Sequence, residues 1–312
     1  MIATTLEAWR PSFTKEQGSQ LPIISIPQAV YPAYRAKMLN GIPKRENNEP
    51  PVIQLMDRVV GESLTVIGDE LDLNRVHTYD ISNVSENGKG KQASDVVNIA
   101  YSLRYNGQDG QVAKIARESI FERDAAVFVS LYEGDAGNTV MGTMRTVLGN
   151  DDDLADPDKS PLELFRYFAH NAGEWPHQTQ GKRPAEVGRF GMNELVSALA
   201  DYKDTRGYGQ LLQRAVFRSL WTAAYAYAND NNCWVGYIAS PAVNEFLRSG
   251  GLYGIPISGL EQNTSDAFQV TRTAFPRYWH PNNPKRQPII YEAPTTLGPI
   301  SCQLPDGSEI AL

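Results

Sequence analysis

The sequence predicts an α/β protein of the α+β type, with a mixed, mostly antiparallel sheet flanked by helices. Two neighbouring runs of high β-propensity, Ala125–Tyr132 and Thr139–Leu148, are separated by a short polar turn and predict an antiparallel hairpin. A later run, Ala185–Met192, precedes a long amphipathic helix, and the strand Cys233–Ala239 follows that helix. This order predicts one strand–helix–strand unit beside the antiparallel hairpin.

The composition is that of an ordinary globular protein. The chain has 312 residues, which is long enough for one large or two small domains. Of these residues, 41% are hydrophobic and 21% are charged. Its net charge of -7 gives no global attraction to nucleic acid or to an anionic membrane. Two cysteines without a CxxC pair suit a reducing compartment. No apolar run reaches the roughly 20 residues of a membrane span and no secretory signal pattern opens the chain, so we expect a cytoplasmic protein.

The first ninety residues differ in pattern from the rest of the chain. Prolines interrupt the first fifty residues so often that we expect no long regular element there. Val52–Ile67 predicts a helix, Leu71–Tyr79 predicts a strand, and the polar run Ser82–Ser94 predicts a linker or loop. We therefore expect an N-terminal extension, residues 1–94, packed on a core domain of residues 95–312.

The core is expected to begin with a helix. Its apolar residues Val96, Ile99 and Leu103 recur at helical spacing, and Ser94 or Asp95 is a candidate cap. The four histidines have no metal-ligand spacing, so no metal site is expected. Local patterns assign the remaining elements: helices over Val112–Ile120, Pro161–His170 and Pro241–Arg248, strands over Phe268–Phe275 and Pro288–Glu292, and a small hairpin from Gly298.

A glycine-containing turn, Arg206-Gly207-Tyr208-Gly209, opens the long helix that follows Ala185–Met192. The first N–H groups of a helix point outward and its dipole favours an anion, so this entrance suits a phosphate group. Arg206 would add a positive charge. The alternative is that the two glycines only make a tight turn.

The order of strand, RGYG turn, long helix, strand and short helix resembles the acyl-CoA-binding half of the GNAT superfamily of acyltransferases. In that family a Gln/Arg-x-x-Gly-x-Gly/Ala turn receives the phosphates of the carrier. Gly207 and Gly209 match the two glycines, whereas Asp204 holds the Gln/Arg position. Either Lys203 or Arg206 then takes over that contact, or the donor is not free CoA. The resemblance implies that the turn from Arg206 to Gly209, Tyr208 included, binds the donor.

A second resemblance concerns two strands. Pro184–Met192 (PAEVGRFGM) looks like the Glu-x-x-Arg-Phe strand of acyl-homoserine-lactone synthases and long-chain N-acyl amino acid synthases, and Val140–Val147 (VMGTMRTV) resembles their Gly-x-x-Arg strand. The resemblance implies that Glu186 is the catalytic base and that Arg145 and Arg189 orient ligand or structure. The acidic cluster of the lactone synthases is not recognisable here, which favours simple amide formation.

The GNAT resemblance also implies a sheet whose strands splay at a central bulge. There a freed backbone N–H, expected at Val187 or Gly188, would bind the thioester carbonyl. Glu186 and Arg189 are three residues apart, and a regular strand would place them on opposite faces. A bulge near Val187 and Gly188 would bring them to one face, and glycine within a strand often marks a bulge.

The chemistry of amide formation suits Glu186. An amine arrives mostly as ammonium at neutral pH, and a nearby carboxylate can accept its proton. The alternative is a structural ion pair of Glu186 with Arg189 or Arg183. Many GNAT enzymes also place a tyrosine general acid after the last core strand. Here that position falls on Phe246 or Leu247, so no general acid is assigned, although Tyr237 and Tyr253 lie nearby in the sequence.

The predicted function is that of an N-acyltransferase. The resemblance implies a fatty-acyl donor, carried by CoA or by the phosphopantetheine of an acyl carrier protein, and an amino acid or peptide amine as acceptor. Three alternatives stay open: an acetyl-CoA-dependent acetyltransferase of small amines, a maturase that acylates a Lys- or ornithine-type side chain of a peptide, and a non-catalytic GNAT-like binding protein.

Overall fold

The structure is a computed structural model. It describes residues 21–42, 49–81, 89–104, 125–150, 162–164, 168–169, 179–257, 261–262 and 289–312, so the elements predicted over Val112–Ile120 and Phe268–Phe275 lie outside the described residues.

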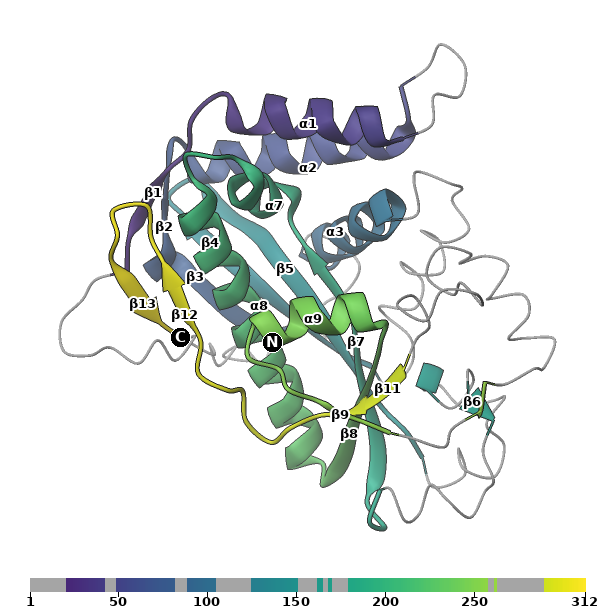
Figure 1. Ribbon diagram of the computed structural model, residues 1–312. Helices are drawn as coiled ribbons and strands as arrows, with labels where there is room; N and C mark the ends of the chain where they lie inside the picture. Colours follow the sequence, from purple (N-terminus) through teal and green to yellow (C-terminus); the bar gives the residue numbers. More distant parts are fainter. Residues whose placement is uncertain are drawn as a thin grey trace, which may run out of the picture.

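A seven-stranded mixed sheet forms the centre of the molecule, in the order β3-β4-β5-β7-β8-β11-β9 (Figure 1). All neighbours are antiparallel except β7 and β8, which are parallel. The predicted mixed, mostly antiparallel sheet is therefore confirmed. The strand bounds are β3 Val76–Asp80, β4 Ala125–Gly134, β5 Gly137–Leu148, β7 Arg183–Met192, β8 Cys233–Ala239, β11 Ile289–Glu292 and β9 Ile255–Pro256.

Helices cover both faces of the sheet (Figure 1). On one face, α8 (Arg206–Asp230) packs on β4, β5 and β8, and a side chain added at Gly142 of β5 would meet Val216 of α8. On the other face lie α2 (Pro51–Ile67) and α3 (Lys89–Arg104), and Gly191 of β7 faces Val97 of α3. Neighbouring strand residues point to opposite faces, so the sheet core is buried on both sides.

The segment before Asp95 contributes to the same core. The expectation of no long element in the first fifty residues is wrong, because α1 (Val30–Gly41) is a regular helix of 12 residues. Its Pro32 lies in the first turn, where the missing N–H breaks no helical hydrogen bond. β3 forms one edge of the main sheet, and the expected boundary at residue 95 falls inside α3.

Several predicted boundaries need correction. α3 already begins at Lys89, so Ser94 and Asp95 lie within the helix instead of capping it. Phe168–Ala169, within a predicted helix, forms β6 and pairs with β10 (Glu261–Gln262). α7 (Glu194–Asp201) follows β7 and packs against α8, where no helix was predicted.

Three predicted elements of the C-terminal part are present in the described residues: α9 (Pro241–Ser249), β11 and the terminal hairpin. α9 comes directly after β8, and Ser240 accepts a hydrogen bond from the N–H of Val243 at its start. The predicted terminal hairpin is present as β12 (Ser301–Gln303) and β13 (Glu309–Ala311). A separate short pair consists of β1 (Ile23–Ser25) and β2 (Glu70–Asp72).

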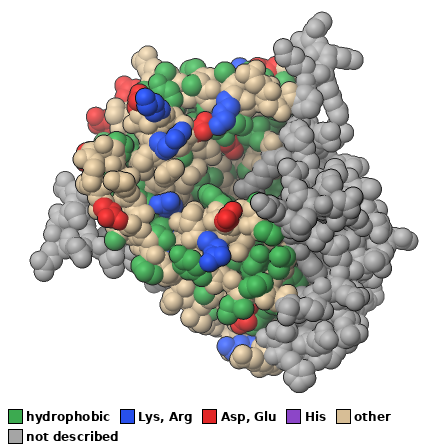
Figure 2. All heavy atoms as spheres, viewed as in Figure 1, with side chains coloured by type: hydrophobic (Ala, Val, Ile, Leu, Met, Phe, Trp, Pro, Cys, Tyr) green, Lys and Arg blue, Asp and Glu red, His purple; other side chains and the backbone are tan. Residues whose placement is uncertain are grey.

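Two surface properties bear on function. Among the described residues, no helix combines the length and apolarity that crossing a membrane would need. On the face seen in Figure 2, basic and acidic side chains are interspersed instead of gathering into a patch of one sign.

Candidate active site

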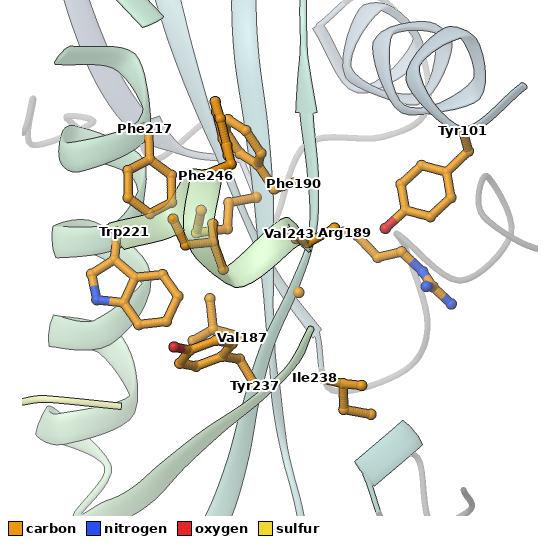
Figure 3. A pocket seen from close by; sticks show the side chains of 13 residues that line it. Tyr101, Val187, Arg189, Phe190, Phe217, Trp221, Tyr237, Ile238, Val243 and Phe246 are labelled. Carbon is orange, nitrogen blue, oxygen red and sulfur yellow. The ribbon is translucent and has the colours of Figure 1, made fainter. Parts of the chain in front are cut away.

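The parallel strands β7 and β8 separate partway along their length. They pair from Arg183 and Cys233 to Glu186 and Gly236, and their described pairing goes no further. Past that point a cavity of about 80 Å³ opens between them and is closed by side chains of α8 and α9 (Figure 3). Its lining is mostly apolar and aromatic: Tyr101, Met144, Val187, Gly188, Arg189, Phe190, Phe217, Trp221, Tyr237, Ile238, Val243, Phe246 and Leu247.

A bulge lies where the strands separate. Arg189 and Phe190 of β7 together oppose the single residue Met144 of β5. Arg189 has a φ of 52°, a left-handed conformation that is uncommon for a residue other than glycine. The bulge thus occurs as expected, but it starts one residue after Gly188, which itself pairs with Arg145.

The bulge distributes the β7 side chains between two faces. Phe190 packs edge-to-face on Phe217 of α8, with ring centroids 5.5 Å apart. Arg189 turns to the other face, where its guanidinium carbon lies 5.6 Å from the centre of the Tyr101 ring of α3. Figure 3 shows the Phe190–Phe217 pair on one side of β7 and the Arg189–Tyr101 pair on the other. The cavity therefore connects the aromatic wall of α8 with the charged groups on the α3 side.

Four charged side chains gather on that α3 side. The Nη2 atom of Arg145 lies 4.0 Å from Oε1 of Glu186 and 3.8 Å from Oε1 of Glu163, and Glu163 also forms an ion pair with Arg189. Oε2 of Glu186 accepts a hydrogen bond of 2.8 Å from the N–H of Leu164. Arg145 and Glu186 are 1% and 4% exposed, so both charges need this compensation.

The structure thus brings together the three predicted catalytic residues, but with different pairings. Glu186 pairs with Arg145, whereas its expected alternative partners Arg189 and Arg183 bind Glu163 and the backbone oxygen of Gly149. Glu186 is absent from the lining of the cavity. A side chain added at Gly188 would nevertheless come within 3.6 Å of Oε1 of Glu186, and Gly188 itself lines the cavity.

Burial and a neighbouring carboxylate change the acidity of Glu186. The pKa of its carboxyl group is raised from 4.5 to about 7, chiefly by desolvation and also by the negative charge of Glu163. The positive charges of Arg145 and Arg189 and the N–H of Leu164 act in the opposite direction. A carboxyl group with a pKa near neutrality exchanges protons readily at physiological pH, as a general base requires.

The glycines at the start of α8 serve helix packing. Arg206–Gly209 form its first turn and, among the described residues, none of the four lines the cavity. A side chain at Gly209 would come within 2.2 Å of the backbone nitrogen of Ala200, so this glycine allows α7 and α8 to pack closely. A side chain at Gly207 would lie 2.9 Å from Pro305, which covers that part of the turn. Binding of a phosphate there stays a prediction.

Aromatic residues of β8 and α9 line the cavity. The hydroxyl of Tyr237 donates a hydrogen bond of 2.9 Å to Asn244, and its ring stacks on that of Tyr291. Burial raises the pKa of the Tyr237 phenol well above its ordinary value, which makes it a poor proton donor. Phe246 and Leu247, the two positions on which the resemblance placed a general acid, both line the cavity, and Phe246 is 40% exposed.

Two residues of this site were not singled out from the sequence. Glu163 lies between Leu162 and Leu164, both 0% exposed, and a lone acid between two buried leucines was the available signal. Tyr101 lies on α3 near its C-terminus, and nothing in the sequence connected it with β7.

Comparison with known proteins gives limited matches. No protein-family model matches the chain, and no curated protein sequence matches it. One similar solved structure is FeeM, an N-acyl amino acid synthase from uncultured soil microbes, with 15% identity over 70% of this chain and 90% of that chain, at a TM-score of 0.37. Another is a tyrosine-to-phenylalanine mutant of the AtaT toxin bound to the C-terminus of the antitoxin AtaR and acetyl-CoA, with 10% identity over 53% of this chain and 79% of that chain, at a TM-score of 0.24.

The fold class rests on the chain's own architecture. A mostly antiparallel sheet, flanked by helices on both faces, has one parallel pair that separates beside a bulge. The fold is therefore GNAT-like, as the resemblance in sequence implied.

Proposed function

We propose that the protein is an N-acyltransferase, which moves an acyl group from a thioester onto the amine of an amino acid or peptide. The carrier of the thioester is CoA or the phosphopantetheine of an acyl carrier protein. The separation of β7 and β8 after Glu186 and Gly236 is the observation that carries this proposal.

The separated strands offer a place for an extended donor. Beyond Glu186, backbone groups of β7 no longer pair with β8, and a ligand that contains amide groups can pair with such a strand edge. Val187 and Gly188 line the cavity at the same place. A backbone N–H of this segment is the proposed donor to the thioester carbonyl, whose oxygen gains negative charge during the attack.

The proposed reaction needs no covalent enzyme intermediate. The amine nitrogen forms a bond to the acyl carbon, the carbon–sulfur bond breaks, and the carrier leaves as a thiolate. Glu186 accepts the proton that the amine loses, directly or through a water molecule beside Gly188, whose missing side chain leaves this route open. A thiol with an ordinary pKa of about 8.5 leaves readily without a dedicated acid.

Two kinds of acyl group are candidates for the donor, a long fatty-acyl group and a short group such as acetyl. The sequence resemblance supports a fatty-acyl donor, and the aromatic and aliphatic lining of the cavity suits an alkyl chain. The cavity of about 80 Å³ supports a short acyl group such as acetyl, because it is smaller than the roughly 150 Å³ cavity that holds a benzene ring. Both candidates share the same donor chemistry.

Mass spectrometry tests the proposal directly. The purified protein is incubated with a series of acyl-CoAs and acyl carrier proteins of increasing chain length, together with free amino acids and with peptides that contain lysine. We expect one donor class and one acceptor class to give an amide product and an equal amount of free thiol. If no combination gives an amide above a protein-free control, the enzyme proposal is wrong and the non-catalytic alternative takes its place.

A further inference from the structure

We propose that Glu163 is a positioning residue of this site, which holds Arg189 at the bulge and, through Arg145, the carboxylate of Glu186. Its role in acyl transfer rests on the proposed function. Its effect on the carboxyl group of Glu186 does not depend on the proposed function, because that effect can be measured without any substrate.

A short segment brings Glu163 to the point where the strands separate. Leu162 and Leu164 on either side of it are fully buried, and the Leu164 side chain would contact a side chain added at Gly236 at a distance of 3.4 Å. Gly236 is the residue paired with Glu186 at the end of the described β7–β8 pairing. The same segment donates the Leu164 N–H to Glu186. The segment therefore contacts both strands at their last paired residues.

Glu163 also fixes the bulge residue. The side chain of Arg189 is 9% exposed and lies between the carboxylate of Glu163 and the ring of Tyr101. Its backbone has the left-handed φ of 52°, a conformation that persists where surrounding contacts hold it. A buried guanidinium that loses its carboxylate partner is strongly destabilised, so Glu163 contributes directly to the geometry of the bulge.

The charges around Glu186 come from three elements. Arg145 of β5 and Arg189 of β7 are positive, and Glu163 is the negative group that competes with Glu186 for both. Tyr101 of α3 is a further titratable group at this cluster and lies against Arg189. Neutralising Glu163 removes a repulsive charge, while the positive charges of Arg145 and Arg189 continue to act on Glu186. Both effects favour the ionised form of Glu186.

The test is a titration of Glu186 that needs no substrate. Glutamate side-chain carboxyl signals are followed by NMR in isotope-labelled protein, and loss of a signal in Glu186→Gln assigns Glu186. In Glu163→Gln we expect the pKa of Glu186 to fall by about one unit from its value of about 7. Glu163→Asp keeps the negative charge, so the pKa of Glu186 should stay close to its wild-type value. Glu245→Gln, an exposed acid on α9, is the matched control and should leave the titration unchanged.

The pH dependence of acyl transfer provides the second measurement. In Glu163→Gln the acidic limb of the kcat/KM profile should move to lower pH by the same amount as the titration. A purely structural role would instead lower the rate at every pH without moving the limb. An unchanged Glu186 titration in folded Glu163→Gln overturns the inference. A shifted titration in a protein that forms no amide with any donor would retain the inference and reject the proposed function.

Discussion

Glu186 of β7 and Gly236 of β8 are the last paired residues before these parallel strands separate. Glu186 is a buried carboxyl group at the place where the backbone of β7 becomes available, and Leu164 packs near Gly236 at the same point. One location thus combines an available strand edge, an apolar cavity and a carboxyl group with a pKa near 7.

Glu186→Gln should abolish most of the acyl transfer. Removal of a general base costs about 100-fold or more in rate, and glutamine keeps nearly the same volume. We expect kcat to fall by this amount at pH values above about 8, where the wild-type carboxyl group is ionised. Steady-state kinetics of amide formation measure the loss, with the exposed Glu245→Gln as control. A rate within twofold of wild type, about 0.4 kcal/mol, would assign proton removal to another group.

The pKa of Glu186 also predicts how stability depends on pH. Because the folded state holds this proton up to about pH 7 and the unfolded state only to about pH 4.5, the protonated form stabilises the fold. This contribution is full below pH 4.5 and is lost as the pH rises through about 7. The free energy of unfolding of wild type, compared with Glu186→Gln by urea titration, should therefore decrease over this range. A constant difference would show that the pKa is not raised.

Gly209→Ala should destabilise the protein. A methyl group would meet the backbone of Ala200, so α7 and α8 must move apart, at a cost of about 1–3 kcal/mol. The matched control is Gly61→Ala in α2, where nothing lies within 4 Å of the added carbon. The control should stabilise the helix by up to about 1 kcal/mol. Equal effects of both substitutions on urea unfolding would contradict the packing role of Gly209.

Arg206→Ala tests the predicted phosphate contact at the start of α8. Arg206 is exposed, so its removal should leave the fold intact. An exposed ion pair between a guanidinium and a phosphate contributes up to about 1 kcal/mol, so we expect up to about fivefold weaker binding of the donor. The loss should appear with acyl-CoA and disappear with an acyl-pantetheine that carries no phosphate. Arg75→Ala, which removes a half-buried arginine just before β3 that pairs with Asp135, is the control. Equal KM values for acyl-CoA in wild type and Arg206→Ala would reject the contact.

Local sequence patterns predicted the regular elements well. The hairpin of β4 and β5, the strand β8 over Cys233–Ala239 and the following helix α9 each have their own periodicity, their own turn residues or a capping serine. α7 escaped notice because it is short, although Asn193 caps it and Glu194 occupies its first turn. The close packing of α7 on α8 also explains a glycine at position 209, where the sequence alone predicted a phosphate contact or a tight turn.

Only part of the arrangement of the candidate site could be predicted from the sequence, and the reason is physical. Glu186, Arg189 and Arg145 belong to adjacent strands, so strand pairing brings them together once the register is known. The position of the bulge depends on which residue of β5 faces two residues of β7, and a single strand carries no such information. Glu163 reaches the site through tertiary packing of a segment distant from both strands, which no local pattern encodes.

The most direct test of the account is to fill the cavity and measure donor binding. Val243 of α9 lines the cavity, whereas its neighbour Ala242 is exposed, so Val243→Trp and Ala242→Trp add the same side chain inside and outside it. Binding of a non-transferable thioether analogue of the best acyl-CoA is measured by calorimetry. We expect a loss of about tenfold or more in Val243→Trp and wild-type affinity in Ala242→Trp. Wild-type affinity in a folded Val243→Trp protein would contradict binding of the donor between β7 and β8.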